Sequence, residues 1–350
     1  MLYQNKLWIS DIDKTIATMH FLEALSGKSI MITGATGLIG SAVVDILFRY
    51  NDVHGTSINI IAAGRSYESM IRRFGHMAER KDFNFIPYDS TKTDNQLSVH
   101  ADYVIHAAAN ANPGVVMKEP VETMLGNFLG IRELLDYAFK EKSKRVLYIS
   151  SSEVYGTKSN DLPFVENEYG FIDILNPRNS YSVGKRAAET LCVSYAKEYG
   201  VESVIVRPGH IYGPTAGKQD NRVSSQWPFA VSRGENIVMK SDGAQIRSYC
   251  YCLDCASAIL TILMKGDNCC AYNISNPDSV ISIKQMAEIL TACARVKLIT
   301  ETPTEMEKQG FNPMSNSSLN SDSLLALGWK GCFPAKEGFG HTVAILKDLV

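Results

Sequence analysis

A glycine-rich turn near the N-terminus constrains the fold of this chain more than any other feature of its sequence. Residues 29–40 read SIMITGATGLIG, in which an apolar run predicts a buried strand before the glycines and helical spacing follows them. Gly34 permits a tight turn, Gly37 lets backbone N–H groups approach a diphosphate, and Gly40 allows the helix to pack close to the strand. A glycine triplet in this context predicts a dinucleotide-binding turn.

Short β-branched runs alternate with longer amphipathic runs through the first 208 residues. Beyond the first strand we expect strands at 58–62, 83–87, 103–107, 145–150 and 202–208, with helices that include 121–142 and 180–199. This alternation indicates a parallel sheet covered by helices on both faces. The predicted fold class is therefore α/β, a Rossmann-like doubly wound parallel sheet with a smaller C-terminal substrate-binding domain.

The pattern also predicts a division of the chain. Residues 1–27 form an N-terminal extension, whose helical segment at 16–25 we expect to pack on the outside. Residues 28–208 form the NAD-binding domain. Pro, Gly, Ser and Asn become frequent afterwards, so residues 209–350 are expected to form mainly the substrate-binding domain, with 255–276 returning to the Rossmann core.

Composition excludes several classes of function. The 35 Lys and Arg against 37 Asp and Glu give a net charge of −2, which lacks the basic signature of a nucleic-acid binder. No apolar run approaches the ~20 residues that span a bilayer, and the N-terminus does not resemble a secretory signal. Eight cysteines are too few for a disulfide scaffold. We expect a cytoplasmic protein with reduced thiols and with neither nucleic-acid nor membrane partners.

A second motif points to catalysis. Tyr181 and Lys185, in NSYSVGKRAAETL, lie four residues apart and so share one helix face. A tyrosine acts as a base near neutral pH only if its pKa falls well below ~10. Lys185 and a positive nicotinamide can stabilise the phenolate, and Ser151 can hydrogen-bond the same substrate hydroxyl. These three residues predict removal of a hydroxyl proton while hydride leaves the same carbon.

The order of glycine loop, serine and Tyr-x-x-x-Lys resembles the extended short-chain dehydrogenase/reductase family, which includes NAD-dependent sugar epimerases and dehydratases. The resemblance covers about residues 28–330. It implies that the Tyr181 phenol is the base, that Lys185 assists it and holds the nicotinamide ribose, and that Ser151 orients the substrate. It also implies a sugar carried on a nucleotide diphosphate as substrate, and a homodimer formed through the helices at 121–142 and 180–199.

The choice of cofactor depends on the end of the second strand. An acid there would bind the ribose 2′-OH of NAD, but Arg65 follows the small residues instead and suits a 2′-phosphate. NAD is expected because a cofactor that is neither consumed nor released suits the family's chemistry, while NADP stays open. Asp89 is a candidate for the adenine. The expected cofactor contacts are Gly34, Gly37, Leu38, Ile39, Gly40, Arg65, Asp89, Ala107, Ala108, Ala109, Asn127, Tyr181 and Lys185.

Several stretches are most similar to the UDP-glucuronate decarboxylase branch of the family. They include SSEVYG at 151–156, DNRVSSQW at 220–227 and DGAQIRSYCYCLD at 242–254. By this resemblance Glu153 and Arg247 join the catalytic residues. The resemblance implies that the substrate-binding residues are Ser152, His210, Arg222 and Arg247.

Decarboxylation is chemically consistent with these residues. Oxidation of C4 turns a glucuronosyl group into a β-keto acid, which loses CO2 readily because the enolate is delocalised, and Glu153 can then handle a proton or water near C5. A 4,6-dehydratase has Asp-Glu where this chain has Ser152-Glu153, and a 4-epimerase needs no glutamate there. Both remain alternatives, as do an NADPH-dependent reductase that Arg65 would suit and a dinucleotide sensor without activity.

Three further positions bear on the substrate or on metal binding. The decarboxylases have tyrosine where Val116 stands, in the segment expected to face the sugar, and asparagine where His210 stands. These changes bear on the identity of the sugar and of the nucleotide, and they do not affect the predicted fold. Three cysteines form a C-x-C-x-x-C pattern without a fourth ligand at zinc spacing, so no metal is expected. They are Cys250, Cys252 and Cys255.

Overall fold

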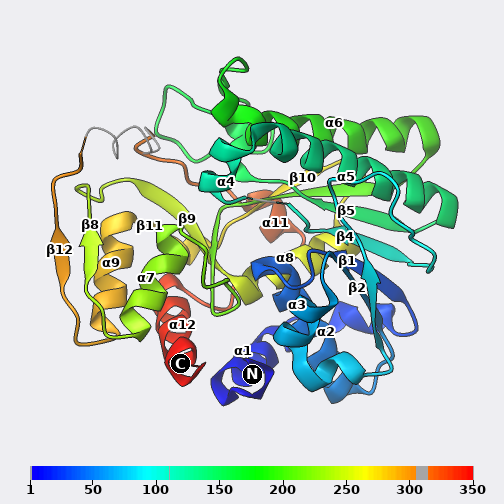
Figure 1. The fold of residues 1–350 in the computed structure, drawn as a ribbon, viewed down its shortest axis with the longest axis horizontal. Helices are drawn as coiled ribbons and strands as arrows, with labels where there is room; N and C mark the ends of the chain where they lie inside the picture. The colour runs from blue at the N-terminus through cyan, green and yellow to red at the C-terminus, as the bar shows by residue number, and fades with distance from the viewer. Residues whose placement is uncertain (1, 110, 305–313, 350) are drawn as a thin grey trace.

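A seven-stranded parallel sheet forms the centre of the computed structural model, which describes residues 2–109, 111–304 and 314–349. Its strand order is β3-β2-β1-β4-β5-β6-β10 (Figure 1). The strands are β1 (Ser29–Thr33), β2 (Asn59–Gly64), β3 (Phe83–Pro87), β4 (Tyr103–His106), β5 (Arg145–Ile149), β6 (Ser203–Pro208) and β10 (Ala271–Ile274). Winding reverses between β1 and β4, which is where ligands bind in such sheets. The predicted Rossmann-like fold class is confirmed.

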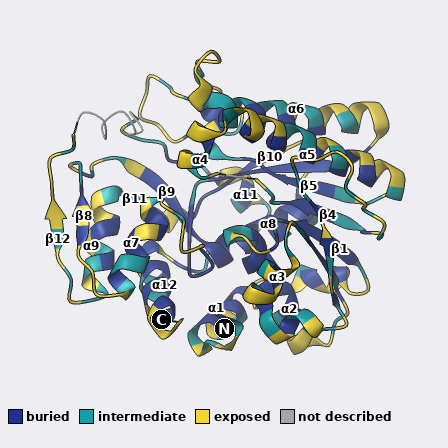
Figure 2. Ribbon diagram, in the orientation of Figure 1, coloured by how far each residue is buried: buried dark blue, intermediate teal, exposed yellow. Residues whose placement is uncertain are grey.

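Helices cover both faces of the sheet, as Figure 1 shows. One face carries α2 and α8, and the other carries α5 and α6, which pack against each other along their length. Alternate strand residues join different cores: Ile30 and Ile32 pack with α2 and α8, whereas Met31 packs with α5 and α6. Most central strand residues are therefore buried (Figure 2). The helices are α2 (Leu38–His54), α5 (Pro120–Glu141), α6 (Ser180–Tyr199) and α8 (Cys252–Lys265).

The C-terminal half adds a smaller layer beside the sheet, at the left of Figure 1. Two small sheets, β11-β9-β7 and β12-β8, pack with helices α7, α9 and α12. Late in the chain, β10 pairs with β6 of the main sheet, and α8 returns to its face. The strands are β7 (His210–Tyr212), β8 (Ile237–Met239), β9 (Ile246–Tyr251), β11 (Val280–Ser282) and β12 (Leu298–Thr300). The remaining helices are α1 (Lys6–Ile16), α3 (Tyr67–Phe74), α4 (Pro113–Lys118), α7 (Val223–Ser232), α9 (Ile283–Ala292), α11 (Asp322–Ala326) and α12 (Ala335–Leu349).

The N-terminal segment differs from the expectation. Its α-helix is α1, at Lys6–Ile16, and only a 3-10 helix at His20–Leu25 lies in the segment expected to be helical. This segment is integral to the core, because Trp8 and Ile12 are fully buried and α1 contacts α2, α8 and α12. Asp11 bonds His341 across 2.9 Å and accepts a hydrogen bond from Tyr251 across 3.0 Å. These partners lie hundreds of residues away, so local periodicity could not indicate them.

The cysteines are partly where the sequence places them. Cys250, Cys252 and Cys255 are buried in β9 and α8, and the described residues contain no group of three or more potential metal ligands. Cys270 is exposed, and Cys269 is half-buried in a left-handed turn before β10. None of the helices that the structure describes combines the length and the apolar character that a bilayer crossing requires.

Candidate active site

The glycine loop lies at the carboxyl end of β1, against the end of β4. Gly34 has a φ of 65°, and a Cβ there would lie 2.7 Å from the carbonyl oxygen of Ala107. A Cβ on Gly40 would lie 2.5 Å from the Gly34 oxygen, so the helix packs against the loop with no room for a side chain. Gly37 caps α2 without a side-chain hydrogen bond. The N–H groups of the first helical turn are therefore available to a diphosphate.

Two cavities meet at this loop. One, of about 390 Å³, runs toward α6 and is lined by Leu38, Ile39 and Ser151 among others. The other, of about 400 Å³, runs toward α5 and is lined by Arg65, Asp89 and others. Both include the loop glycines Gly34 and Gly37 and the small residues Ala107 and Ala109 after β4. The thirteen residues expected to contact the cofactor all line one cavity or the other, and these are Gly34, Gly37, Leu38, Ile39, Gly40, Arg65, Asp89, Ala107, Ala108, Ala109, Asn127, Tyr181 and Lys185.

This groove fits a dinucleotide. Asn127 donates to the Thr123 carbonyl across 2.8 Å, but its side-chain oxygen is buried without a partner, and the Ser150 hydroxyl is likewise unpaired. Both residues line the cavities, so a polar ligand would satisfy them. Asp89 is held ionised: burial opposes this, but bonds from Thr91 and the charges of Arg65 and Lys92 keep its pKa below the usual value.

The predicted catalytic residues come together at the α6 end of the groove. Lys185 donates to the Ile149 carbonyl across 2.7 Å, and its Nζ lies 5.7 Å from the centre of the Tyr181 ring. The Ser151 hydroxyl hydrogen-bonds the Tyr181 phenol and also accepts from the Glu153 backbone N–H across 3.2 Å. The strand end at Ile149 and the first turns of α6 thus fix the three side chains in one place.

The electrostatics of this cluster leave the phenol protonated. Burial raises the pKa of Tyr181 to about 12, although the hydrogen bond from Ser151 opposes this. Burial lowers the pKa of Lys185 to about 7, and nearby Glu189 partly opposes that change. A tyrosine with a pKa of about 12 is a poor base at neutral pH. Additional positive charge beside the phenol is therefore needed before it can accept a substrate proton.

A third cavity, of about 300 Å³, begins where the first ends. It is lined by Ser152, Glu153, Arg178 and His210, whereas the neighbouring residue Ser151 lines the first cavity. Glu153 is open to the water of this cavity but enclosed by protein on its other sides. Burial raises the pKa of Glu153, while the charges of Arg178 and Arg247 lower it. The charges of two guanidinium groups therefore act on the glutamate, and its own charge raises the pKa of the Tyr181 phenol.

The other predicted substrate residues differ in their placement. Arg247 is buried and donates a hydrogen bond to the Ile246 carbonyl across 2.8 Å. Its side chain does not line the cavity, so it acts on Glu153 through its charge. Arg222 lines the first cavity and is paired with Asp220 through its Nε across 2.9 Å. Burial lowers the pKa of His210 to about 4, with help from Arg247 and Arg222, so the imidazole is neutral near pH 7.

Two residues of this site escaped the sequence analysis. Arg178 lies three positions before Tyr181, and Asp220 lies two before Arg222. Asp220 stands in a stretch already singled out and Arg178 directly precedes another, so a charged neighbour of the motif was the available signal. Val116, expected to face the sugar, is buried in α4 and lines none of the three cavities described here.

Comparisons with known proteins agree with this geometry. The model of the NAD dependent epimerase/dehydratase family matches residues 30–275. UDP-glucuronic acid decarboxylase 6 of Arabidopsis thaliana is 30% identical over 316 residues, which cover 89% of this chain and 87% of that protein. UDP-glucuronic acid decarboxylase 1 of Danio rerio is 28% identical over 329 residues, covering 93% and 74%.

Solved structures share the fold at lower sequence identity. UDP-glucose 4-epimerase of Thermotoga maritima, solved with UDP-glucose, is 23% identical, with a TM-score of 0.76 and coverage of 92% of this chain and 99% of that one. UDP-glucuronic acid 4-epimerase of Bacillus cereus, solved with UDP-glucuronic acid and NAD, is 22% identical, with a TM-score of 0.74 and coverage of 92% and 100%. The match to the family model and the relative at 30% identity place this chain in the NAD-dependent epimerase/dehydratase family.

Proposed function

We propose that this enzyme converts UDP-glucuronate to UDP-xylose through oxidation at C4 and loss of CO2. One observation carries the proposal: Glu153, two residues after Ser151, lines one cavity with Arg178, and its carboxyl group is subject to the charges of Arg178 and Arg247 and acts in turn on Tyr181. A carboxylate-bearing sugar needs cations near C5, and a decarboxylase needs a group that handles a proton there. The similarity to proteins named UDP-glucuronic acid decarboxylase supports the same assignment.

The cofactor and the nucleotide would be held by different parts of the groove. The first turn of α2 would bind the cofactor diphosphate, with Asp89 on the adenosine side and Lys185 on the nicotinamide side. Arg222 would bind the nucleotide of the substrate from the loop before α7, where Asp220 fixes its guanidinium. The sugar would then extend past Tyr181 toward the cavity of Glu153.

The first chemical step would be loss of the C4 hydroxyl proton to Tyr181. Ser151 hydrogen-bonds the phenol and would orient the sugar hydroxyl, while Lys185 would stabilise the phenolate from 5.7 Å away. Bound NAD supplies reversible two-electron oxidation of the sugar carbon, and its positive nicotinamide adds the charge that the phenol needs. The result is a 4-keto sugar whose C5 carries the carboxylate.

Loss of CO2 follows from that structure. The bond between C5 and the carboxylate carbon breaks, and its electron pair enters the C4–C5 enolate. Glu153 would deliver a proton to C5, directly or through water, and Tyr181 would return its proton to the C4 oxygen when the ketone is reduced. Arg178 would hold the substrate carboxylate before it leaves, and the charges of Arg178 and Arg247 would balance that of Glu153 afterwards.

Epimerisation of the same sugar is the second candidate. Two departures from the decarboxylase pattern keep it open: Val116 stands where those enzymes have tyrosine and is buried away from the three cavities, and His210 replaces asparagine on the cavity wall. An epimerase would rotate the keto sugar and return it at constant mass. The neighbour of known structure that bears UDP-glucuronic acid supports this alternative only through its fold.

Mass spectrometry of a panel of nucleotide sugars incubated with the purified protein tests the proposal, with and without added NAD. Loss of CO2 from UDP-glucuronate supports it. A changed retention time at constant mass supports the epimerase instead, and loss of water supports a dehydratase. UDP-glucuronate that stays unchanged while another sugar reacts contradicts the proposed substrate.

We also propose a homodimer formed by α5 and α6. These two helices pack side by side, and exposed apolar side chains lie along both. They include Met124, Leu125, Phe139, Val193 and Tyr199. Exposed apolar side chains on two adjacent helices indicate a protein interface. Light scattering of the purified protein tests it, and a monomer mass would contradict it.

The cytoplasm is the proposed compartment. All eight cysteines are free thiols, including the exposed Cys270. Proteins of oxidising compartments commonly use such residues in disulfides. Fractionation of the source cells would test this proposal, and recovery in an extracellular fraction would contradict it.

A further inference from the structure

A small polar cavity lies at the end of β2, next to the predicted adenosine site. It has a volume of about 140 Å³ and shares Thr36, Gly64 and Arg65 with the larger cavity that holds Asp89. Its remaining walls include Ser66 and Ser69 from the start of α3. None of the ten described residues that line it is an aspartate or glutamate. In a doubly wound fold, this is the position beside the ribose 2′ oxygen.

We infer that this cavity binds the 2′-phosphate of NADP, so that the site accepts both NAD and NADP. Its chemistry suits a phosphate group: a guanidinium for the charge, and three hydroxyl groups that can donate hydrogen bonds. The inference concerns the adenosine end of the cofactor and is independent of the sugar substrate.

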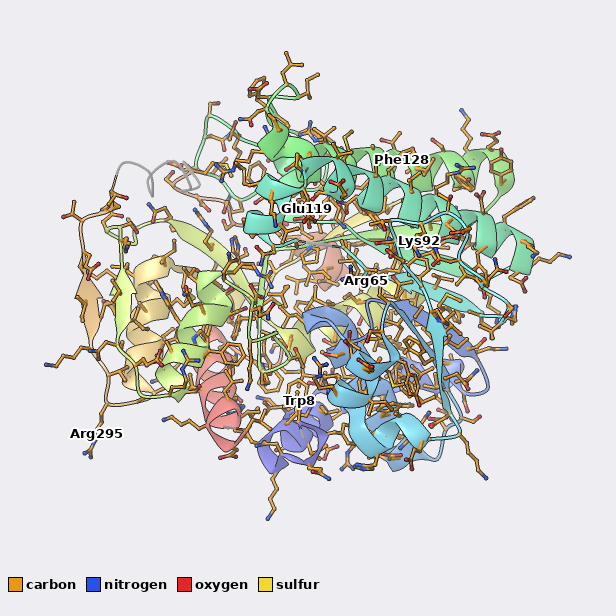
Figure 3. The ribbon with its side chains drawn as sticks, in the orientation of Figure 1. Trp8, Arg65, Lys92, Glu119, Phe128 and Arg295 are labelled. Carbon is orange, nitrogen blue, oxygen red and sulfur yellow. The ribbon has the colours of Figure 1, made fainter. Side chains whose placement is uncertain are left out.

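Arg65 is suited to this role by its surroundings. Its side chain is exposed, and within the described part of the chain it forms no salt bridge. It lies in the opening between α3 and α5 (Figure 3). The nearest acid that it affects, Asp89, lines the neighbouring cavity and not this one. Its charge is thus available to a ligand that enters between the two cavities.

The hydroxyl groups belong to a rigid frame. Ser66 caps α3 by accepting the Ser69 backbone N–H across 3.1 Å, which leaves the hydroxyl hydrogen of Ser66 for a ligand. The floor is apolar: Phe85 lines the cavity and packs edge-on against Tyr67 with ring centres 5.6 Å apart. The cavity is therefore preformed at the turn from β2 into α3. An acid at the end of β2, which would repel a phosphate, is absent there because the strand ends in Gly64.

Acceptance of either cofactor is compatible with the proposed reaction. The proposed cycle would take a hydride from the sugar and return it to the sugar, so turnover would not depend on the ratio of oxidised to reduced cofactor in the cell. A 2′-phosphate would then add binding energy without changing the chemistry at C4. In enzymes restricted to NAD, an acidic residue at this position excludes NADP. The proposed cycle does not require such exclusion.

Calorimetric titration of nucleotide-free protein with NAD and NADP tests the inference. We expect the wild-type Kd for NADP to lie within about tenfold of that for NAD, and Arg65→Ala to weaken NADP by about tenfold or more while NAD changes little. Arg72→Ala, which removes an exposed arginine of α3 outside the cavity, is the matched control and should change neither Kd.

A second variant separates phosphate binding from other roles of Arg65. Ser66→Asp keeps the helix cap and adds an acid at the ribose, so it should abolish NADP binding and retain NAD. Adenosine 2′,5′-bisphosphate should bind the wild-type protein more tightly than adenosine 5′-phosphate. Equal loss of NAD and NADP in Arg65→Ala would mean that Arg65 only stacks on the adenine and would overturn the inference. A wild-type preference for NAD above about 100-fold would also overturn it.

Discussion

The cofactor loop depends on the close approach of Gly34 to the backbone after β4, and replacement of Gly34 by alanine tests this dependence. Gly34 and Gly55 have nearly the same positive φ, at 65° and 63°. They differ in what a side chain would meet. A Cβ on Gly34 would lie 2.7 Å from the Ala107 carbonyl oxygen, whereas a Cβ on Gly55, at the end of α2, would have nothing within 4 Å. Gly55→Ala is therefore a control for the backbone conformation alone.

The two variants should differ in stability by a measurable amount. Left-handed backbone costs an alanine roughly 1–2 kcal/mol, which applies to both. Gly34→Ala must also separate the loop from the end of β4, and overpacking of a rigid contact adds about 1–3 kcal/mol. Backbone atoms lie on both sides of this contact, so no flexible side chain can move away. We expect Gly34→Ala to be less stable than Gly55→Ala by about 1–3 kcal/mol.

Denaturant unfolding and NAD titration of both variants test the argument together. Displacement of the loop moves the first turn of α2 away from the diphosphate, so Gly34→Ala should weaken NAD by about tenfold or more, while Gly55→Ala should bind NAD as the wild type does. Equal stability losses in the two variants, together with unchanged NAD affinity in Gly34→Ala, would refute the reasoning. That result would mean that the loop tolerates a side chain against Ala107.

Four further predictions concern the reaction and the assembly. Tyr181→Phe should lower turnover by about 10²- to 10⁴-fold but leave NAD affinity nearly unchanged, as product mass spectrometry and calorimetry would reveal. Glu153→Gln should slow CO2 release more than C4 oxidation, so that the 4-keto sugar accumulates; equal losses would exclude a role at C5. Leu125→Glu in α5 should give a monomer in light scattering, whereas Val53→Glu, an equally exposed apolar position on α2, should not. Lys185→Met should move the acid limb of the turnover profile to higher pH.

The fold and the reaction motifs could be predicted because their signals are local. Gly34, Gly37 and Gly40 occupy one turn, and Tyr181 and Lys185 share one helix face at a fixed spacing. The parallel sheet follows from alternating strand and helix patterns. β2 ends at Gly64, two residues beyond the end predicted at residue 62. The last two residues have low strand propensity, but they pair with the neighbouring strands β1 and β3, and this pairing extends the strand.

What the sequence did not indicate depends on contacts between distant segments. Asp11 pairs with His341, 330 positions away, and this contact is why the N-terminal segment belongs to the core rather than to the outside. The Arg178 side chain reaches Glu153 only because the chain between them folds back beside α6. The exposure of Cys270 similarly depends on the turn that precedes β10. Periodicity within one element cannot specify such pairs.

The pH prediction for Lys185 follows from the opposing effects in the cluster. Tyr181 is the proposed base, so the acid limb of turnover should report ionisation of its phenol, whose pKa burial raises to about 12 before any cofactor charge acts. The pKa of Lys185 itself is lowered to about 7, so its ammonium group, 5.7 Å from the ring centre, acts on the phenol only near and below neutral pH, where it lowers the phenol pKa, and Lys185→Met removes that effect. The acid limb should therefore move up by about 1–3 pH units, and turnover should recover as pH rises. Lys197→Met, in the last turn of α6, should leave the limb in place. An unmoved limb with lower turnover at every pH would mean that Lys185 acts through its bond to Ile149 and the position of the cofactor, and not through charge.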